Sequence, residues 1–208
     1  MINNTYLKKQ LTLHNIEPNA VQLEQLQHYI QLLQNWNKVY NLIGSADTKQ
    51  VIDRHIIDSL LALPYIGGKK IIDVGTGAGL PGIPLAIMLP DSNFSLLDSN
   101  GKKTRFITQV KVDLHLSNVE VIKTRVEEYK PVALFNTIIS RAFANLTNML
   151  NVTKHLCAPD GIFVALKGDD AENEMLSLPA NFSYKQVERL PFVDKSINRK
   201  VVVIKQLS

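Results

Sequence analysis

A glycine-rich segment offers the clearest chemistry in the chain, because residues 71–82 read Ile-Ile-Asp-Val-Gly-Thr-Gly-Ala-Gly-Leu-Pro-Gly. Glycines let the backbone turn sharply and let a ligand approach main-chain atoms that a Cβ would shield. Leu80 stands where the dinucleotide fingerprint has its third glycine, and no Gly-Lys-Ser/Thr ending marks a P-loop. The spacing therefore predicts a nucleotide-type site. Its predicted loop residues are Gly75, Thr76, Gly77 and Gly79.

Two carboxylates narrow the class of ligand. Asp73 immediately precedes the loop, where a negative charge would repel a pyrophosphate but would suit a cation. That position favours S-adenosylmethionine, which carries an ammonium and a sulfonium group. Asp98 ends the next predicted strand, about 20 residues beyond the loop, where a carboxylate can accept hydrogen bonds from both ribose hydroxyls. A nicotinamide-dependent oxidoreductase also fits Asp98 and the strand-loop-helix pattern, but Asp73 and Leu80 count against it.

Two later segments are candidates for the rest of the site. Val126 and Glu127 follow the third predicted strand, from which a backbone amide and a carboxylate can reach an adenine ring. The alternative is that the glutamates there only begin a short helix. Arg141 ends the fourth predicted strand, at the edge where the acceptor must lie, and can hold a phosphate or guanine O6 through forked hydrogen bonds. A structural ion pair of Arg141 with Asp73 or Glu127 is the alternative.

Missing motifs limit the acceptor chemistry. Methylation of an exocyclic base amine in such folds usually relies on Asn/Asp-Pro-Pro-Tyr/Phe after the fourth strand, where this chain has Ser-Arg-Ala-Phe-Ala. Methylation at a pyrimidine carbon usually needs a cysteine nucleophile, and Cys157 falls in a predicted helix, where a buried structural thiol is expected. A ring nitrogen such as guanine N7 has an in-plane lone pair and needs no prior deprotonation. Positioning would then supply most of the catalysis.

Basic residues are candidates for RNA contacts. The formal net charge is +4 and the pI is about 9.1, and the excess lies largely at the C-terminal end. Solvated faces are the alternative explanation for every cluster. A non-enzymatic RNA-binding or ribosome-assembly factor with a vestigial donor site fits the same charges. The candidate RNA contacts are Lys102, Lys103 and Arg105 mid-chain, Lys167 after the fifth predicted strand, and Lys195, Arg199 and Lys200 around the last strand.

The elements that must position these residues change type near residue 67. Before it, apolar residues recur at three- and four-residue steps, which predicts helices. After it, short β-branched runs alternate with helix-length segments, which predicts parallel βαβ units. The predicted helices lie around residues 7–13, 22–40, 51–63, 84–89, 102–116, 146–156 and 171–178. The predicted strands are 70–74, 94–97, 119–123, 137–140, 162–166, 184–190 and 200–205.

Together with the predicted S-adenosylmethionine site, this order predicts an α/β protein with the Rossmann-like fold of S-adenosylmethionine-dependent methyltransferases. We expect a mostly parallel seven-stranded sheet, closed at one edge by an antiparallel hairpin of the last two strands. Residues 1–66 are expected to form a helical segment packed on the catalytic domain, residues 67–208. In the third predicted helix, His55 and Asp58 could touch RNA or donor, although the flanking isoleucines favour a packed histidine.

Composition excludes several other classes of protein. Of 208 residues, 45% are hydrophobic and 20% charged, which gives a globular chain enough apolar content for a core and excludes disorder throughout. The apolar runs are too short to span a membrane, and the start of the chain carries no export signal. One cysteine excludes an internal disulfide framework and a Cys-based zinc cluster. We therefore expect a cytoplasmic protein without a metal. A monomer is the default expectation, because the sequence does not determine the oligomeric state.

Longer strings resemble a known family. Residues 73–84, with Leu-Leu-Asp-Ser at 96–99 and Ser-Arg-Ala-Phe-Ala at 140–144, are similar to the bacterial 16S ribosomal RNA guanine-N7 methyltransferases, also called glucose-inhibited division protein B. The resemblance implies S-adenosylmethionine as donor, S-adenosylhomocysteine as product, and a guanine in the 530 loop of the small subunit as acceptor. The likeness continues at 36–42, 54–60, 125–128 and 165–168. By the same resemblance, the donor contacts fall on Gly75, Leu80, Val126, Glu127 and Arg141.

Overall fold

The computed structural model describes residues 4–45, 47–141, 143, 145–192 and 197–207. Helices make up the first third of the chain, as predicted. The second of them begins at a capping box between Asn19 and Gln22 and ends at Asn41, which adopts a left-handed conformation. These helices are α1 (Asn4–Leu13), α2 (Ala20–Tyr40), α3 (Thr48–Val51), the π-helix η1 (Ile52–Ile57), α4 (Asp58–Leu60) and the 3₁₀-helix η2 (Leu63–Tyr65).

Seven strands form one sheet, in the order β3-β2-β1-β4-β5-β7-β6. The first five in this order pair in parallel, whereas β7 is antiparallel to both β5 and β6. The predicted parallel sheet with an antiparallel closing hairpin is confirmed. The strands are β1 (Lys70–Val74), β2 (Asn93–Leu97), β3 (Val119–Ile122), β4 (Phe135–Arg141), β5 (Cys157–Lys167), β6 (Phe182–Arg189) and β7 (Lys200–Gln206).

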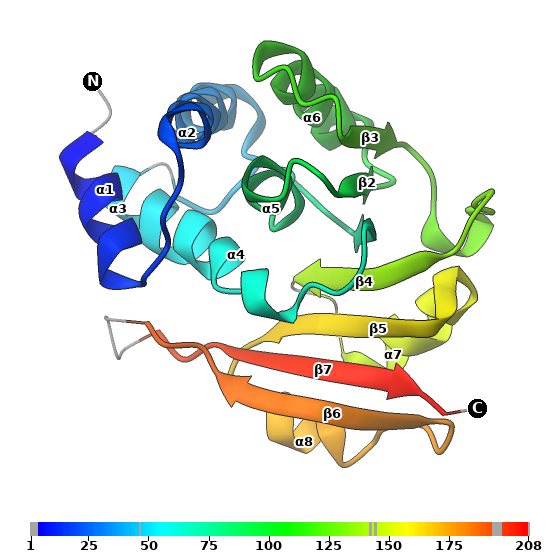
Figure 1. Ribbon diagram of the computed structural model, residues 1–208. Coiled ribbons are helices and arrows are strands. Elements are labelled where there is room, and N and C mark those ends of the chain that lie inside the picture. Colours follow the sequence, from blue (N-terminus) through cyan, green and yellow to red (C-terminus); the bar gives the residue numbers. More distant parts are fainter. Residues whose placement is uncertain (1–3, 46, 142, 144, 193–196, 208) are drawn as a thin grey trace.

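Helices cover both faces of this sheet. In Figure 1, α5 (Gly82–Met88) and α6 (Gly101–Asp113) lie on one face with α2 beyond them. The other face carries α7 (Leu146–Thr153) and α8 (Ala171–Met175). Each face has its own cluster of buried apolar side chains. Short 3₁₀-helices complete the connections: η3 (Val126–Glu128) and η4 (Lys154–Leu156).

The N-terminal helices share one apolar core with the sheet. Leu26 and Ile30 of α2 belong to the same buried cluster as Ile83 of α5 and Phe106 of α6. The ring of Trp36 lies 5.5 Å from that of Phe106. Because apolar burial drives such packing, α2 is held against the sheet's helices rather than being free of them. The domain boundary near residue 66 stays a prediction.

The predicted position of Cys157 in a helix is wrong. Cys157 is the first residue of β5 and does not lie in a helix, because α7 ends at Thr153 and a single 3₁₀ turn follows it. The thiol therefore sits at the amino end of a parallel strand, at the edge of the sheet opposite the glycine loop. Burial raises the pKa of Cys157 to about 11, which keeps the thiol protonated and unreactive. Among the described residues, no helix is long and apolar enough to cross a membrane.

Candidate functional site

The glycine loop follows β1 at the carboxyl edge of the sheet. Gly75 and Gly77 have φ angles of +71° and +62°, a region that residues with a Cβ rarely adopt. Their amide groups anchor the loop to the next strand, because Gly75 N donates to Leu97 O at 2.9 Å and Gly77 N donates to the Asp98 carboxylate at 3.0 Å. The loop is thus shaped by backbone conformation and by bonds to the end of β2.

Asp73 holds the glycine loop from inside the protein through one of its two carboxylate oxygens. Its Oδ2 accepts hydrogen bonds from Thr76 Oγ1 at 2.6 Å and from Gly82 N at 2.8 Å, and the side chain is fully buried. Burial raises the pKa of Asp73 to about 6, while the bonds from Thr76 and Gly82 oppose that rise. The side chains of Asp73 and Thr76 are both enclosed by the protein, so the predicted contact of Asp73 with a cationic ligand does not fit its position.

Tyr29 is a loop contact that the sequence analysis missed. From α2, its hydroxyl donates to the carbonyl of Ala78 at 2.7 Å, and the side chain is fully buried. Burial raises the pKa of this hydroxyl, so it remains a donor. The helical spacing indicated that Tyr29 is buried, but not which part of the molecule it would touch. An N-terminal helix therefore supports the middle of the glycine loop.

A cavity opens between the loop and the ends of β2 and β3. Asp98 lies at its wall, with Oδ1 accepting from Asn100 N at 2.8 Å and Lys103 Nζ 3.7 Å from Oδ2. The predicted residues Gly75, Asp98, Val126 and Glu127 are brought together here. Gly79 and Leu80 are not part of this wall, since Leu80 is buried in the core and a Cβ on Gly79 would lie 2.6 Å from Ile83 Cγ1. The lining residues are Val74, Gly75, Leu97, Asp98, Ser99, Thr124, Arg125, Val126, Glu127 and Phe143.

Arg141 lies at the end of β4, but its partner is neither Asp73 nor Glu127. Its Nη1 lies 3.3 Å from Asp58 Oδ2 and from His55 Nδ1, and donates to the carbonyl of Arg54 at 3.1 Å. The predicted alternative, an ion pair of Arg141 with Asp73 or Glu127, is therefore wrong. The partners come from the π-helix η1 and the start of α4, so the N-terminal helices form one wall of the carboxyl edge.

Some of the predicted RNA contacts are exposed cations, whereas others form ion pairs within the protein. Lys102 and Arg105 are exposed on the first turns of α6, beside the glycine loop. Lys167 is only 7% exposed and forms an ion pair with Glu174 at 2.7 Å, which argues against a phosphate contact. Arg199 Nε lies 3.6 Å from Asp58 Oδ1, and Lys200 pairs with Glu172. Lys195 lies outside the described residues.

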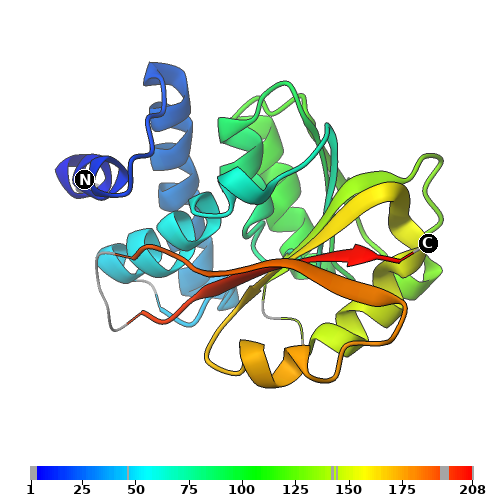
Figure 2. The same ribbon diagram turned by 60° about the horizontal axis from the view of Figure 1, so that its bottom comes forward.

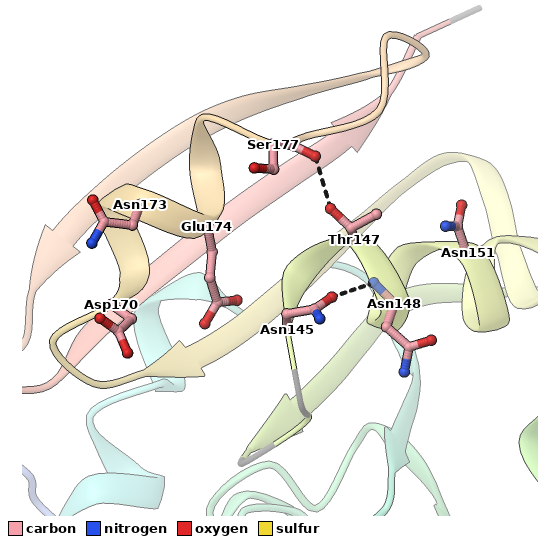
Figure 3. A pocket seen from close by; sticks show the side chains of 8 residues that line it. All are labelled: Asn145, Thr147, Asn148, Asn151, Asp170, Asn173, Glu174 and Ser177. Carbon is pink, nitrogen blue, oxygen red and sulfur yellow. Dashed lines mark hydrogen bonds between the residues drawn. The ribbon is translucent and has the colours of Figure 1, made fainter.

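A second, larger cavity of about 680 Å³ lies between α7 and α8 (Figure 3). Thr147 Oγ1 donates to the carbonyl of Ser177 at 2.8 Å and ties α7 to the turn that follows α8. The described lining holds two carboxylates, Asp170 and Glu174, and no Lys or Arg, so it does not suit a phosphate. The lining residues are Asn145, Thr147, Asn148, Asn151, Asp170, Asn173, Glu174 and Ser177.

Comparisons with known proteins identify the family of this chain. The family model described as rRNA small subunit methyltransferase G matches residues 22–203. Ribosomal RNA small subunit methyltransferase G of Salmonella arizonae is 49% identical over 85% of this chain and 86% of its own length. The enzyme of that name from Nitrosococcus oceani is 43% identical over 98% of this chain and 95% of its own.

Solved structures support the fold. The crystal structure of coclaurine N-methyltransferase bound to N-methylheliamine and S-adenosylhomocysteine superposes with a TM-score of 0.59, over 89% of this chain and 70% of that one. Its sequence identity is 14%, so this likeness bears on the fold alone. The predicted Rossmann-like methyltransferase fold is confirmed. Because the family model spans most of the sequence and relatives exceed 40% identity, this chain belongs to the rRNA small subunit methyltransferase G family.

Proposed function

We propose that this protein transfers a methyl group from S-adenosylmethionine to N7 of a guanine in the 530 loop of 16S ribosomal RNA. The observation that carries the proposal is the cavity at the carboxyl ends of β1, β2 and β3, where Gly75, Asp98 and Val126 converge. Ligands of open α/β sheets bind at this edge. Family membership supports an RNA acceptor, because the curated relatives are named for the small-subunit ribosomal RNA.

The residues of this cavity fit the donor. Each oxygen of Asp98 accepts one backbone hydrogen bond, and a carboxylate oxygen can accept more than one, so both can still bind ribose hydroxyls. A Cβ built on Gly75 would lie 3.9 Å from the Phe143 ring, in the space that the ligand needs. Val126 and Glu127 would border the adenine. When bound, S-adenosylmethionine supplies an electrophilic methyl group.

The acceptor chemistry follows from which side chains can reach the cavity. The Cys157 thiol lies at the opposite edge of the sheet, so a cysteine-dependent attack on a pyrimidine carbon is not available to it. Guanine N7 carries its lone pair in the ring plane and needs no base to activate it. Arg141 then has the role of holding the reactants in line, which is where most of the rate enhancement arises. Arg141 is the last residue of β4 and precedes Phe143 of the cavity wall by two positions in the chain.

The RNA is held electrostatically on the α6 side of the cavity. Lys102 and Arg105 are exposed there, and Lys103 lies over the loop, 4.0 Å from a Cβ built on Gly77. We expect these cations to contact phosphates of the small subunit or of an assembly intermediate. The protein is proposed to act as a monomer in the cytoplasm, where ribosomal subunits are found.

Transfer of a labelled methyl group to isolated small ribosomal subunits tests this function. Subunits that lack the modification are incubated with labelled donor and native protein, and heat-inactivated protein is the control. Incorporation of label into 16S RNA supports a methyltransferase. Tight binding of subunits without incorporation would instead identify a ribosome-assembly factor. Binding of a nicotinamide dinucleotide, with no binding of S-adenosylhomocysteine, would contradict the donor assignment.

A further inference from the structure

Two residues of the π-helix η1 and the first residue of α4 place three hydrogen-bond acceptors around one nitrogen of Arg141. The carbonyl oxygen of Arg54 lies 3.1 Å from Nη1, and both His55 Nδ1 and Asp58 Oδ2 lie 3.3 Å from it. Every hydrogen bond and ion pair that Arg141 makes with the described residues runs through Nη1. The guanidinium is planar and has five donor hydrogens in a fixed fork, so fixing one nitrogen leaves Nε and Nη2 available in a set direction.

His55 takes part as a neutral acceptor. Arginine has no acceptor atom, so the ring nitrogen Nδ1 must accept the hydrogen bond, and the ring proton is on Nε2. Burial, and then the positive charge of Arg141, lower the pKa of His55 to about 4. The imidazole therefore adds no charge at neutral pH. Its Nδ1 lies 3.3 Å from Arg141 Nη1 as an uncharged acceptor.

Asp58 carries the only negative charge among these groups, and its side chain is 1% exposed. A buried carboxylate needs charged partners, and it has two, since Arg199 Nε approaches Oδ1 at 3.6 Å while Arg141 holds Oδ2. Burial raises the pKa of Asp58, and the two guanidinium groups oppose that rise. Two cations on one anion leave the cluster of Asp58, Arg141 and Arg199 with a net positive charge. Figure 2 shows the N-terminal end of β7, next to Arg199, reaching toward the N-terminal helices.

We propose that Asp58 is a positioning residue for the methyl-transfer reaction. It fixes Arg141 so that the remaining guanidinium nitrogens face an oxyanion of a bound reactant. That oxyanion is either the carboxylate of the donor or a phosphate of the acceptor RNA. The inference rests on the proposed function, because it assigns a partner to Arg141 at the same site. π-Helical turns are rare and are frequently found at functional sites, which agrees with this role.

A double-mutant cycle tests whether Asp58 acts through Arg141. Asp58→Asn keeps the shape of the side chain but removes its charge, and Arg141→Ala removes the group to be positioned. Methyl-transfer kcat/KM is measured for wild type, each single variant and the double variant. We expect Asp58→Asn to lower kcat/KM about tenfold alone and less than twofold in the Arg141→Ala background.

Asp53→Asn is the matched control, because Asp53 lies on the same π-helix but accepts a hydrogen bond from Tyr6 Oη at 2.6 Å. It should leave kcat/KM within about twofold of wild type. Calorimetric affinity for S-adenosylhomocysteine and filter-binding affinity for small subunits separate the two sources of the oxyanion. A loss in the first identifies the donor carboxylate, and a loss in the second identifies an RNA phosphate.

Additive effects of Asp58→Asn and Arg141→Ala would overturn the inference, as would wild-type kcat/KM and wild-type affinities in the Asp58→Asn variant. A lower melting temperature with unchanged kinetics would also overturn it, because the role would then be structural only. Failure of the proposed function is distinguishable, since it would appear as absence of methyl transfer by the wild-type protein. The cycle is then read in the two affinities, which need no transfer.

Discussion

The donor and acceptor halves of the site are built in different ways. The donor half uses the residues that directly follow three consecutive strands of the sheet: the glycine loop after β1, Asp98 after β2, and Val126 with Glu127 after β3. The acceptor half brings together residues from distant parts of the chain. Arg141 donates to the carbonyl of Arg54, 87 positions away, and Asp58 bridges Arg141 to Arg199.

Because of this difference, substitutions in the two halves should have different effects on donor binding and RNA binding. The donor half is defined by backbone conformation, by bonds between neighbouring loops and by one bond from α2. Damage there should remove donor binding and leave RNA binding intact. The acceptor half depends on side-chain charge and on how the N-terminal helices pack. Damage there should change RNA binding or the rate of transfer. Four variants, taken from the largest expected effect to the smallest, test this separation.

Gly77→Val should have the largest effect. The φ angle of +62° costs a residue with a Cβ about 1–2 kcal/mol, and more when the side chain is β-branched. The added side chain would also occupy the space above the loop, so donor binding should become undetectable by calorimetry while the fold survives. Gly44→Val is the control, because a Cβ at Gly44 meets nothing within 4 Å. Donor binding by the Gly77 variant at wild-type affinity would show that the glycine loop is not part of the donor site.

Asp98→Ala should weaken donor binding by about 1.5–3 kcal/mol, as expected when hydrogen bonds to a charged acceptor are lost. The loop would also lose the bond from Gly77 N. Isothermal calorimetry with S-adenosylhomocysteine measures the loss, and filter binding should show unchanged affinity for small subunits. An unchanged donor affinity would show that Asp98 does not bind the ribose.

Neutralising Lys102, Lys103 and Arg105 to Gln should weaken RNA binding and flatten its salt dependence. Each lost phosphate contact removes about one unit from the slope of log affinity against log salt. Lys103 also lies 3.7 Å from Asp98, so the double variant Lys102→Gln with Arg105→Gln isolates the RNA effect. The control replaces Lys8, Lys9 and Lys111, which changes net charge equally. Equal slopes of log affinity against log salt in the triple variant and wild type would mean that these three residues of α6 are only solvated.

Tyr29→Phe should have the smallest effect on the donor half. It removes the bond to the Ala78 carbonyl and leaves a buried acceptor unpaired, which costs about 1–3 kcal/mol of stability. Part of that loss should appear as a donor affinity reduced severalfold, because the loop is less well held. Thermal unfolding and calorimetry on the same samples measure both effects. A destabilised variant with full donor affinity would show that α2 supports the core and not the loop.

The same difference explains what could be predicted from the sequence. Asp98 and Glu127 were predictable because a parallel βαβ order places each strand end at one edge, so local spacing is enough. The π-helical turn was not predictable, since its sequence has the spacing of an ordinary amphipathic helix. Nor was the Asp58–Arg141 pair, because it depends on how the N-terminal helices dock. Asp73 was assigned to the ligand because spacing along the chain does not reveal that its side chain turns inward.

The position of the transferred methyl group tests the central claim most directly. Unmodified small subunits are incubated with isotopically labelled S-adenosylmethionine and the wild-type protein, the 16S RNA is digested, and the labelled nucleosides are identified by mass spectrometry. We expect N7-methylguanosine as the single labelled nucleoside, derived from a fragment of the 530 loop. Label on an exocyclic amine, on a pyrimidine carbon, or on no nucleoside at all would contradict the account.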